Sequence, residues 1–251
     1  MLTIGVLGGM GPAAGVDFYA RVVAAHDAPR DQDHPPCILY SATQVPDRTA
    51  FLFGDGPDPT PALTAAARTL EAAGADFIAI PCNAAHAFLA AIREAVEVPV
   101  LDMIVLAAAA AAEIAVVPEV GLLAASGTVR AGLYDAPLRR HGLEPIFPSD
   151  DQQQAVMAAI RQVKGGGGSG TGVPDPRLVT AAKHLKDLGA GSLILGCTEV
   201  PLALAATDCP SPAIDANQVL AATALALALG ILDVADCEAA GSSLEGGIGR
   251  S

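Results

Sequence analysis

The sequence contains no tryptophan, and aromatic residues make up only 4% of its 251 positions. Its core must therefore be built from aliphatic side chains, and a hydrophobic content of 52% is sufficient for that and excludes a disordered chain. Positive charge is scarce as well: 14 Lys and Arg face 27 Asp and Glu, for a formal net charge of −13. Because nucleic acids and anionic membranes attract clustered cations, we expect neither as a partner.

Paired cysteines and long apolar runs are also missing. The five cysteines lie at positions 37, 82, 197, 209 and 237 without a CxxC pair, which argues against a disulfide framework, a zinc site and a thiol–disulfide redox protein. The longest apolar stretches are interrupted by polar residues or glycine, so we expect no membrane-spanning helix. The first residues lack the basic region and cleavage site of a signal peptide, which favours a cytoplasmic protein.

Short apolar runs alternate with longer amphipathic or alanine-rich stretches along the chain. The expected strands are 2–7, 37–41, 77–81, 98–102, 119–124, 144–147, 192–196 and 212–215. The expected helices are 13–26, 60–73, 84–95, 104–115, 129–141, 150–163, 176–188 and 217–230. Alternation of this kind predicts an α/β fold with parallel sheets flanked by helices.

An internal repeat divides the chain into two halves. The segments "LEAAGADFIAIPC" at 70–82 and "LKDLGAGSLILGC" at 185–197 align without a gap, and "GVLGG" from Gly5 parallels "GLLAA" from Gly121. The spans from these glycines to the cysteines that end the aligned segments differ by a single residue. We therefore predict two similar lobes, each a parallel sheet flanked by helices, related by pseudo-two-fold symmetry with the active site between them.

The predicted first lobe comprises residues 1–103 and is completed by residues 213–251, and the second comprises residues 104–212. In each lobe a cysteine follows the carboxyl end of a strand: Cys82 in the first and Cys197 in the second. Parallel α/β sheets bind ligands at this edge, so both thiols should line one cleft.

Two glycine-rich stretches are not nucleotide-binding motifs. "GGGGSGTG" at 165–172 lacks the Gly-Lys-Ser/Thr ending of a P-loop, and we interpret it as a flexible loop, with a mobile flap over a site as the alternative. "GVLGGMGP" at 5–12 does not match the G-x-G-x-x-G pattern. A glycine turn before a helix can still present backbone N–H groups to a carboxylate.

Five short motifs are distributed along the chain. They are "GGMGP" at 8–12, "PDRT" at 46–49, "PCNAAH" at 81–86, "GTVRAGLY" at 127–134 and "LGCTEVPL" at 195–202. From residue 4 to about residue 230, the chain resembles the aspartate racemase branch of the aspartate/glutamate racemase superfamily. The resemblance implies racemisation of an acidic amino acid, aspartate or glutamate, without pyridoxal phosphate, another cofactor or a metal, and it implies a homodimer.

The chemistry of racemisation explains the paired cysteines. Inverting an α-carbon requires removing a proton from one face and returning one to the other, which a thiolate and a thiol on opposite faces can do without moving. The resemblance assigns these acid/base roles to Cys82 and Cys197. Since a free thiol has a pKa of about 8.5, the site should lower the pKa of one cysteine, and a helix N-terminus after it would help. His86 and Glu199 are expected either to tune the cysteines or to bond to backbone.

Substrate contacts are implied for the seven residues Met10, Gly11, Arg48, Asn83, Thr128, Lys164 and Thr198. Arg48 has a physical argument behind it, because arginine binds carboxylates bidentately and an acidic protein needs a local cation to bind an anion. Lys164 corresponds to a family position that contacts the distal carboxylate, although a lysine at a helix end can also simply be exposed. Asn83 and Thr198 would donate hydrogen bonds to the substrate or to an enolate-like intermediate.

Two departures from the family pattern leave the substrate open. Ala84 and Ala125 stand where the family has threonine, so each half loses a hydroxyl and a larger or less polar amino acid could be accommodated. A superfamily decarboxylase or cis–trans isomerase is an alternative, but a decarboxylase of that type needs only the second cysteine, and the presence of Cys82 argues against it. A non-catalytic small-molecule binding protein is the other alternative, supported only by the two alanines.

Overall fold

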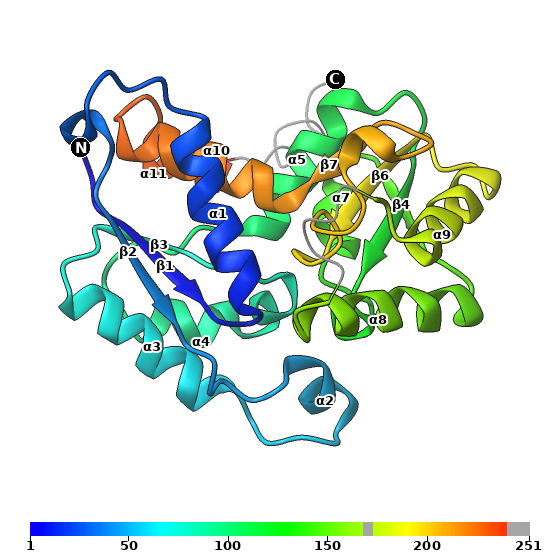
Figure 1. Ribbon diagram of the computed structural model, residues 1–251, viewed down its shortest axis with the longest axis horizontal. Coiled ribbons are helices and arrows are strands. Elements are labelled where there is room, and N and C mark those ends of the chain that lie inside the picture. The colour runs from blue at the N-terminus through cyan, green and yellow to red at the C-terminus, as the bar shows by residue number, and fades with distance from the viewer. Residues whose placement is uncertain (168–172, 240–251) are drawn as a thin grey trace, which may run out of the picture.

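The computed structural model describes residues 1–167 and 173–239, which form two lobes side by side (Figure 1). Each lobe is built on a parallel sheet, with the strand order β2-β1-β3 in the first and β5-β4-β6-β7 in the second. The strands are β1 (Ile4–Gly8), β2 (Cys37–Ser41), β3 (Phe77–Ala79), β4 (Glu119–Ala124), β5 (Glu144–Ile146), β6 (Ser192–Gly196) and β7 (Ala213–Asp215). In both sheets the first strand lies between the second and the third, which confirms the predicted two-lobed α/β fold.

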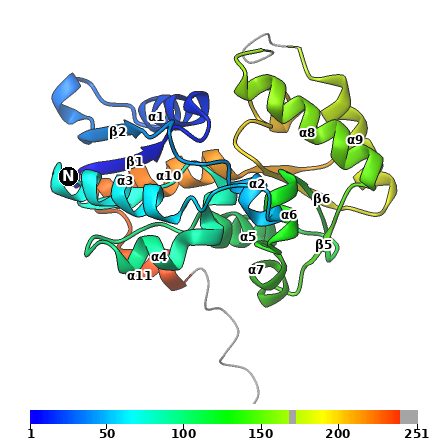
Figure 2. The same ribbon diagram turned by 90° about the horizontal axis from the view of Figure 1, so that it is seen from below.

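Helices flank both sheets (Figure 2). The α-helices are α1 (Pro12–Ala24), α2 (Arg48–Phe53), α3 (Thr60–Ala72), α4 (Leu89–Glu94), α5 (Met103–Ile114), α6 (Ser126–Arg130), α7 (Asp135–Arg140), α8 (Asp150–Lys164), α9 (Pro176–Asp187), α10 (Ala216–Ala228) and α11 (Val234–Ala239). The described part of the chain also contains three 3₁₀ helices: η1 (Asp31–Asp33), η2 (Asn83–Phe88) and η3 (Ala206–Asp208). Among the described residues, no helix combines the length and the apolar character needed to cross a bilayer.

The repeated glycines occupy equivalent positions in the two central strands. A Cβ atom on Gly5 in β1 would lie 2.7 Å from the Cβ of Ala75, and one on Gly121 in β4 would lie 2.6 Å from Cδ2 of Leu193. Ala75 has no rotatable bond to relieve the first contact, and a Cβ on Gly121 would still meet Cβ of Leu185 at 3.0 Å if Leu193 shifted, so glycine permits the close packing beside each central strand. The internal repeat therefore reflects the same packing requirement in both lobes.

Two predicted elements differ from the structure for local reasons. The expected strand at 98–102 is reduced to one bridge between Ile78 and Val100, because Pro99 has no N–H to extend a ladder. The expected helix at 129–141 is two shorter helices, α6 and α7. The chain turns between them at Gly132, whose φ of 61° is left-handed and therefore favours glycine.

Other short helices were misjudged from the sequence. The expected helix at 84–95 begins as the 3₁₀ helix η2 and becomes α-helical only at Leu89. Helices α2 and α11 were not predicted. Helix α2 has recognisable end signals: Asp47 accepts the Ala50 N–H at its start, and Gly54 with a φ of 85° ends it. Residues 168–172 of the glycine-rich stretch lie outside the described residues.

A shared core joins the two lobes. Ile4 of β1 and Ile194 of β6 belong to one buried cluster that also contains Phe18 of α1, Met103 of α5 and Leu220 of α10. Helix α10 packs on α1 and also on α5 (Figure 1). Because helices from both halves fill this cluster, the two sheets are connected by packed side chains and not only by the chain that crosses between them.

The chain leaves the second sheet through β7. Strand β7 hydrogen bonds to β6 in the second sheet, whereas the predicted boundary counted residues 213–215 with the first lobe. The chain then passes through α10 to α11, which lies beside the first lobe (Figure 1). The exact lobe boundaries stay a prediction.

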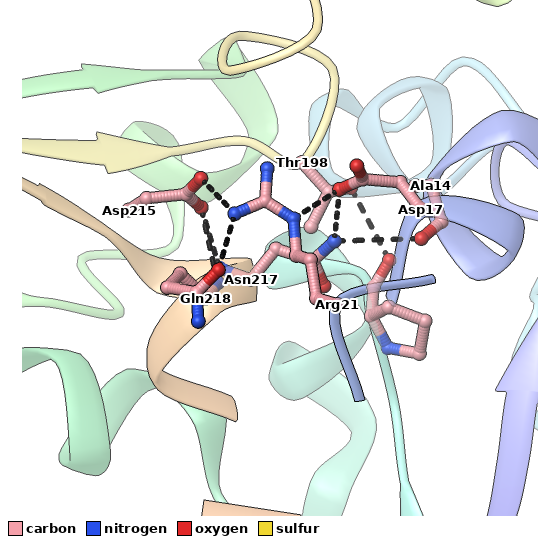
Figure 3. Close-up of polar contacts among 8 residues, drawn as sticks. Ala14, Asp17, Arg21, Thr198, Asp215, Asn217 and Gln218 are labelled. Atoms are coloured by element: carbon pink, nitrogen blue, oxygen red, sulfur yellow. Dashed lines mark hydrogen bonds and ion pairs between the residues drawn. The ribbon is translucent and has the colours of Figure 1, made fainter. Parts of the chain in front are cut away.

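A polar network fixes α1 to the start of α10 (Figure 3). Arg21 lies between two carboxylates, with Nε 2.6 Å from Oδ2 of Asp17 and Nη1 2.7 Å from Oδ2 of Asp215. Asp215 also caps α10 by accepting the N–H groups of Asn217 and Gln218. Burial raises the pKa of the Asp215 carboxyl above its usual value, although Arg21 acts in the opposite direction.

Candidate active site

A cavity of about 470 Å³ lies between the lobes, lined by residues that follow the carboxyl ends of β1, β3, β4 and β6. This is the edge at which parallel sheets bind ligands. The predicted site residues in its wall are Met10, Arg48, Cys82, Asn83, Thr128, Lys164, Cys197, Thr198 and Glu199. Gly11 and His86 were also predicted but lie outside the lining.

Cys82 follows β3 and begins the 3₁₀ helix η2. Its side chain is buried and is a free thiol. The cysteine sits at the N-cap of η2 in an extended conformation, so the first backbone N–H groups of that helix follow it directly. The predicted arrangement of a strand-end cysteine entering a helix is thus present in the first lobe.

Cys197 is placed by β6 but has a different electrostatic environment. It is also a free, buried thiol, and the residues after it form turns, with the Val200 N–H donated to its carbonyl. Its Sγ donates to Oε2 of Glu199 at 3.0 Å. Burial and then the Glu199 carboxylate raise the pKa of this thiol well above its usual value. The expected helix N-terminus is absent here, and Cys197 is held as a thiol.

Glu199 connects the two lobes beside Cys197. It is only 2% exposed, and its Oε1 accepts the Gly11 N–H at 2.9 Å. Lys164 lies 3.8 Å from the same oxygen and donates to the Met10 carbonyl at 3.0 Å. Burial lowers the pKa of Lys164, but its surroundings, the Glu199 carboxylate foremost, raise that pKa above its usual value. Lys164 is therefore the counter-ion of Glu199. Gly11 contributes to the site by holding the Glu199 carboxylate with its backbone N–H.

His86 is committed to backbone groups. Its Nδ1 lies 2.9 Å from the Cys82 carbonyl, and its Nε2 accepts the Met103 N–H at 3.1 Å. Because a backbone N–H can only donate, Nε2 must be unprotonated and Nδ1 must carry the proton. Burial lowers the pKa of His86, which keeps this neutral form. Of the two roles considered for His86, the structure favours backbone support of the Cys82 turn.

Three buried donors in the cavity wall have no hydrogen-bond partner within the described residues: Nε of Arg48, Nδ2 of Asn83 and Oγ1 of Thr128. Arg48 is 7% exposed, and its terminal nitrogens donate to the carbonyls of Met10, Val45 and Pro46, which hold the guanidinium in place. Leaving a buried polar group unpaired costs about 1–3 kcal/mol. A carboxylate in the cavity would satisfy such donors.

The two departures from the family pattern both face the cavity. Ala84 and Ala125 line it, one from each lobe. Thr198 keeps its hydroxyl, but donates it to the Pro81 carbonyl at 3.2 Å. This bond joins the turn after Cys197 to the turn before Cys82, so Thr198 positions the two cysteine turns relative to each other.

Helices α2 and α6 are in contact beside the cavity. A Cβ atom on Gly127 in α6 would lie 2.9 Å from Cα of Thr49 in α2, so the helices touch where Gly127 has no side chain. Arg130 of α6 lies over the ring of Phe53 in α2, 5.5 Å from its centroid. These contacts bring the neighbouring residues Arg48 and Thr128 into the same cavity wall.

Several cavity residues were missed by sequence reasoning. They are Asp47, Thr49, Ala50, Phe53 and Asp55 around α2, Ser126 at the start of α6, and Met157, Ile160 and Arg161 on α8. The α8 residues carry a detectable signal, because together with Lys164 they recur at helical spacing and so share one helix face. Those around α2 could be expected only once the helix itself is recognised. Within residues 1–167 and 173–239, no cluster of His, Cys, Asp and Glu could hold a metal ion.

Comparison with known proteins gives a consistent result. The family model described as Asp/Glu/Hydantoin racemase matches residues 7–224. The broad specificity amino-acid racemase RacX of Bacillus subtilis is 31% identical over 173 residues, which cover 64% of this chain and 70% of RacX. A glutamate racemase of Corynebacterium kroppenstedtii is 31% identical over 171 residues, 63% of this chain and 57% of that protein.

A solved structure supports the same comparison over a longer span. The aspartate racemase of Picrophilus torridus superimposes with a TM-score of 0.75 at 29% sequence identity. The superposition covers 91% of this chain and 94% of that protein, so both lobes are included.

Proposed function

Because the chain belongs to the Asp/Glu/hydantoin racemase family, we propose that it is an amino-acid racemase that uses two cysteine thiols and no cofactor. One observation carries the proposal: each lobe delivers one buried cysteine, from the end of the equivalent strand, to the same cavity. The proposed acid/base pair is Cys82 and Cys197.

The reaction follows from this pairing. The thiolate of one cysteine removes the α-hydrogen as a proton and becomes a thiol, and the electron pair stays on the α-carbon. The carbon becomes planar because the adjacent carboxylate accepts part of the charge. The thiol of the other cysteine then donates its proton to the opposite face and becomes a thiolate. The product is the mirror image of the substrate, and the two cysteines have exchanged roles.

The resting protonation state sets which enantiomer reacts first. Burial and Glu199 raise the pKa of Cys197, and its sulfur is the donor in the bond to Glu199. We therefore propose that Cys197 is the acid of the resting site, so that the enantiomer whose α-hydrogen faces Cys82 finds its proton donor already in place.

The proposed substrate is an acidic amino acid, aspartate or glutamate. The unpaired donors of Arg48, Asn83 and Thr128 suit a carboxylate, because they are buried and already held in position. Met10 and Lys164 complete the wall beside them. The homodimer and the cytoplasmic location expected from the sequence remain predictions.

The alternative functions have less support from the site. A decarboxylase of the superfamily type needs only Cys197, which leaves the buried Cys82 in the same cavity without a role. A binding protein without turnover would need no thiol on either side of its ligand. The paired thiols favour proton transfer over both.

The proposal is tested by incubating the protein in heavy water with a panel of L- and D-amino acids and no added cofactor. We expect deuterium to replace the α-hydrogen of aspartate or glutamate, together with loss of optical purity, as measured by mass spectrometry and chiral chromatography. A carbonyl-trapping reagent that inactivates pyridoxal enzymes should have no effect. A failure of every amino acid to exchange would overturn the proposal, and release of carbon dioxide from a substituted malonate would favour the decarboxylase.

Replacing Glu199 by glutamine is expected to shift the pH dependence. The substitution removes a negative charge that raises the pKa of Cys197, so that pKa should fall. When Cys197 is the base it must be ionised, and when it is the acid it must be protonated. For the enantiomer on which Cys197 acts as the base, the acid limb of the kcat/KM profile should move to lower pH. For the enantiomer on which Cys197 acts as the acid, the alkaline limb should move to lower pH.

The control for this prediction is Glu113→Gln, which makes the same chemical change at an exposed position of α5. Its pH profiles should match those of the unmodified protein. Profiles of Glu199→Gln that coincide with the unmodified ones would show that Glu199 does not control the thiol.

A further inference from the structure

One face of α8 forms part of the second-lobe wall of the cavity. Met157, Ile160, Arg161 and Lys164 line it and are spaced three, four and seven residues apart from Met157, as expected for one side of a helix. The first two side chains are apolar and the last two are cationic. The wall therefore changes from apolar to positively charged along the helix.

The Lys164 end of this helix face is the end that lies near the cysteines. Lys164, at the end of α8, contacts the Met10 carbonyl and lies near Glu199, next to the reacting thiols. At the other end of this face, Met157 accepts the Ser126 N–H through its sulfur. Arg161 lies three residues before Lys164, or about 4.5 Å along the helix axis. A substrate side chain that extends from the cysteines along α8 therefore meets Arg161.

Arg161 is the cation of the cavity wall that the other described residues leave without a partner. Both terminal nitrogens of Arg48 donate to backbone carbonyls, and Lys164 is engaged with Met10 and Glu199. Within residues 1–167 and 173–239, the Arg161 guanidinium makes no hydrogen bond or ion pair. Its five N–H donors are therefore available to a ligand.

We propose that Arg161 is a specificity-determining residue that binds the distal carboxylate of the substrate and selects an acidic side chain over a neutral one. This inference rests on the proposed racemase function and adds a residue to its site. The α-carboxylate pairs with the donors of Arg48, Asn83 and Thr128, and the distal carboxylate forms a bidentate pair with Arg161. The methylene groups between them pack on Ile160.

The length of the substrate follows from the same arrangement. Ala84 and Ala125 leave the wall without the hydroxyls expected there, and the cavity of about 470 Å³ has room for a long side chain. A carboxylate that must reach a residue one helical turn from Lys164 is better placed on two methylene groups than on one. Glutamate is therefore the better fit of the two acidic amino acids.

The test compares glutamate with glutamine, which has the same shape without the charge. We expect Arg161→Met to lower the ratio of the glutamate to the glutamine kcat/KM, measured by α-hydrogen exchange, by about 10- to 100-fold, mainly through KM. Arg161→Lys should recover part of the ratio, because it keeps the charge but cannot bind bidentately. Lys183→Met is the control, since it removes one exposed cation of the same lobe outside the cavity.

Binding measurements separate this inference from the proposed function. Calorimetric titration of glutamate and glutamine into a Cys82→Ser/Cys197→Ser chain, with and without Arg161→Met, reports binding without turnover. If the unmodified protein exchanges no amino acid, the racemase function fails, but a loss of glutamate binding on removing Arg161 would still support the contact. An unchanged glutamate-to-glutamine binding ratio overturns the inference, as does an equal loss for both ligands or an equal effect of Lys183→Met.

Discussion

Replacing either Cys82 or Cys197 by serine is expected to reduce racemisation by about 10³-fold or more. A positioned acid or base contributes about 10²–10⁴-fold, and a serine hydroxyl is too weak an acid to supply a comparable base near neutral pH. Each substitution removes one of the two proton-transfer groups and leaves the other in the cavity. Racemisation needs both, so neither single variant should interconvert the enantiomers.

The thiol that remains in each variant should still catalyse exchange of the α-hydrogen for deuterium in heavy water. With Cys197→Ser, Cys82 can still remove and return the α-proton on its own face, so one enantiomer should acquire deuterium without inversion. With Cys82→Ser, the other enantiomer should do so. The measurement is mass spectrometry of each enantiomer after separation on a chiral column.

The protein supplies a matched control in each lobe. Cys37 lies in β2 and Cys209 follows η3, and both are free cysteines outside the cavity wall. Burial raises the pKa of each to about 11. Cys37→Ser and Cys209→Ser should racemise at the normal rate. Normal racemisation by Cys82→Ser or Cys197→Ser would rule out the two-thiol mechanism.

The second large effect is expected on stability, from Arg21→Met. Arg21 balances Asp17 and Asp215 between α1 and α10, and 20% of its side chain is exposed. Removing one partner of a buried ion pair costs about 3–5 kcal/mol, and partial exposure reduces this to about 2–4 kcal/mol of unfolding free energy here. Urea denaturation followed by circular dichroism measures the change. Arg68→Met, at an exposed position of α3, should change stability far less.

The pH dependence identifies the cause of that loss. Burial raises the pKa of folded Asp215, so its contribution to stability is present below the usual carboxyl pKa of about 3.9 and is lost as pH rises through the folded value. Without Arg21 the folded pKa rises further. The stability gap between Arg21→Met and the unmodified protein should therefore narrow as the pH falls from 7 toward 5.

A double variant tests the same cause independently of pH. Asp215→Asn removes the carboxylate that Arg21→Met leaves unpaired, and asparagine can still cap α10. The double variant should be more stable than the sum of the two single changes predicts. Strict additivity would show that the Arg21–Asp215 pair contributes little.

The sequence was most informative where the same packing requirement occurs in both halves of the chain. A side chain at Gly5 or Gly121 would force its neighbours in the central strands to shift, and the two cysteines follow equivalent strands. The repeat therefore predicted both the two lobes and the sheet edge that lines the cavity. Local signals also existed where the prediction failed. Gly132 separates α6 from α7.

The remaining site residues depend on how distant elements pack. The periodicity of α8 places Arg161 beside Lys164 but does not say that this face meets a cavity instead of the core or solvent. His86 and Glu199 have similar positions after their cysteines in the sequence. Only the folded backbone shows that one bonds to main-chain groups and the other to a thiol.

The meeting of α2 and α6 has a thermodynamic consequence for any ligand of this cavity. Thr49 and Gly127 are in contact, and the unpaired donors belong to their chain neighbours, Arg48 and Thr128. A ligand that bonds to both donors favours the arrangement in which the two helices touch, and by reciprocity that arrangement favours the ligand by the same free energy. A ligand too short to reach both donors gains no affinity from this coupling. The affinity of the cavity therefore depends on the length of the ligand as well as on its charge.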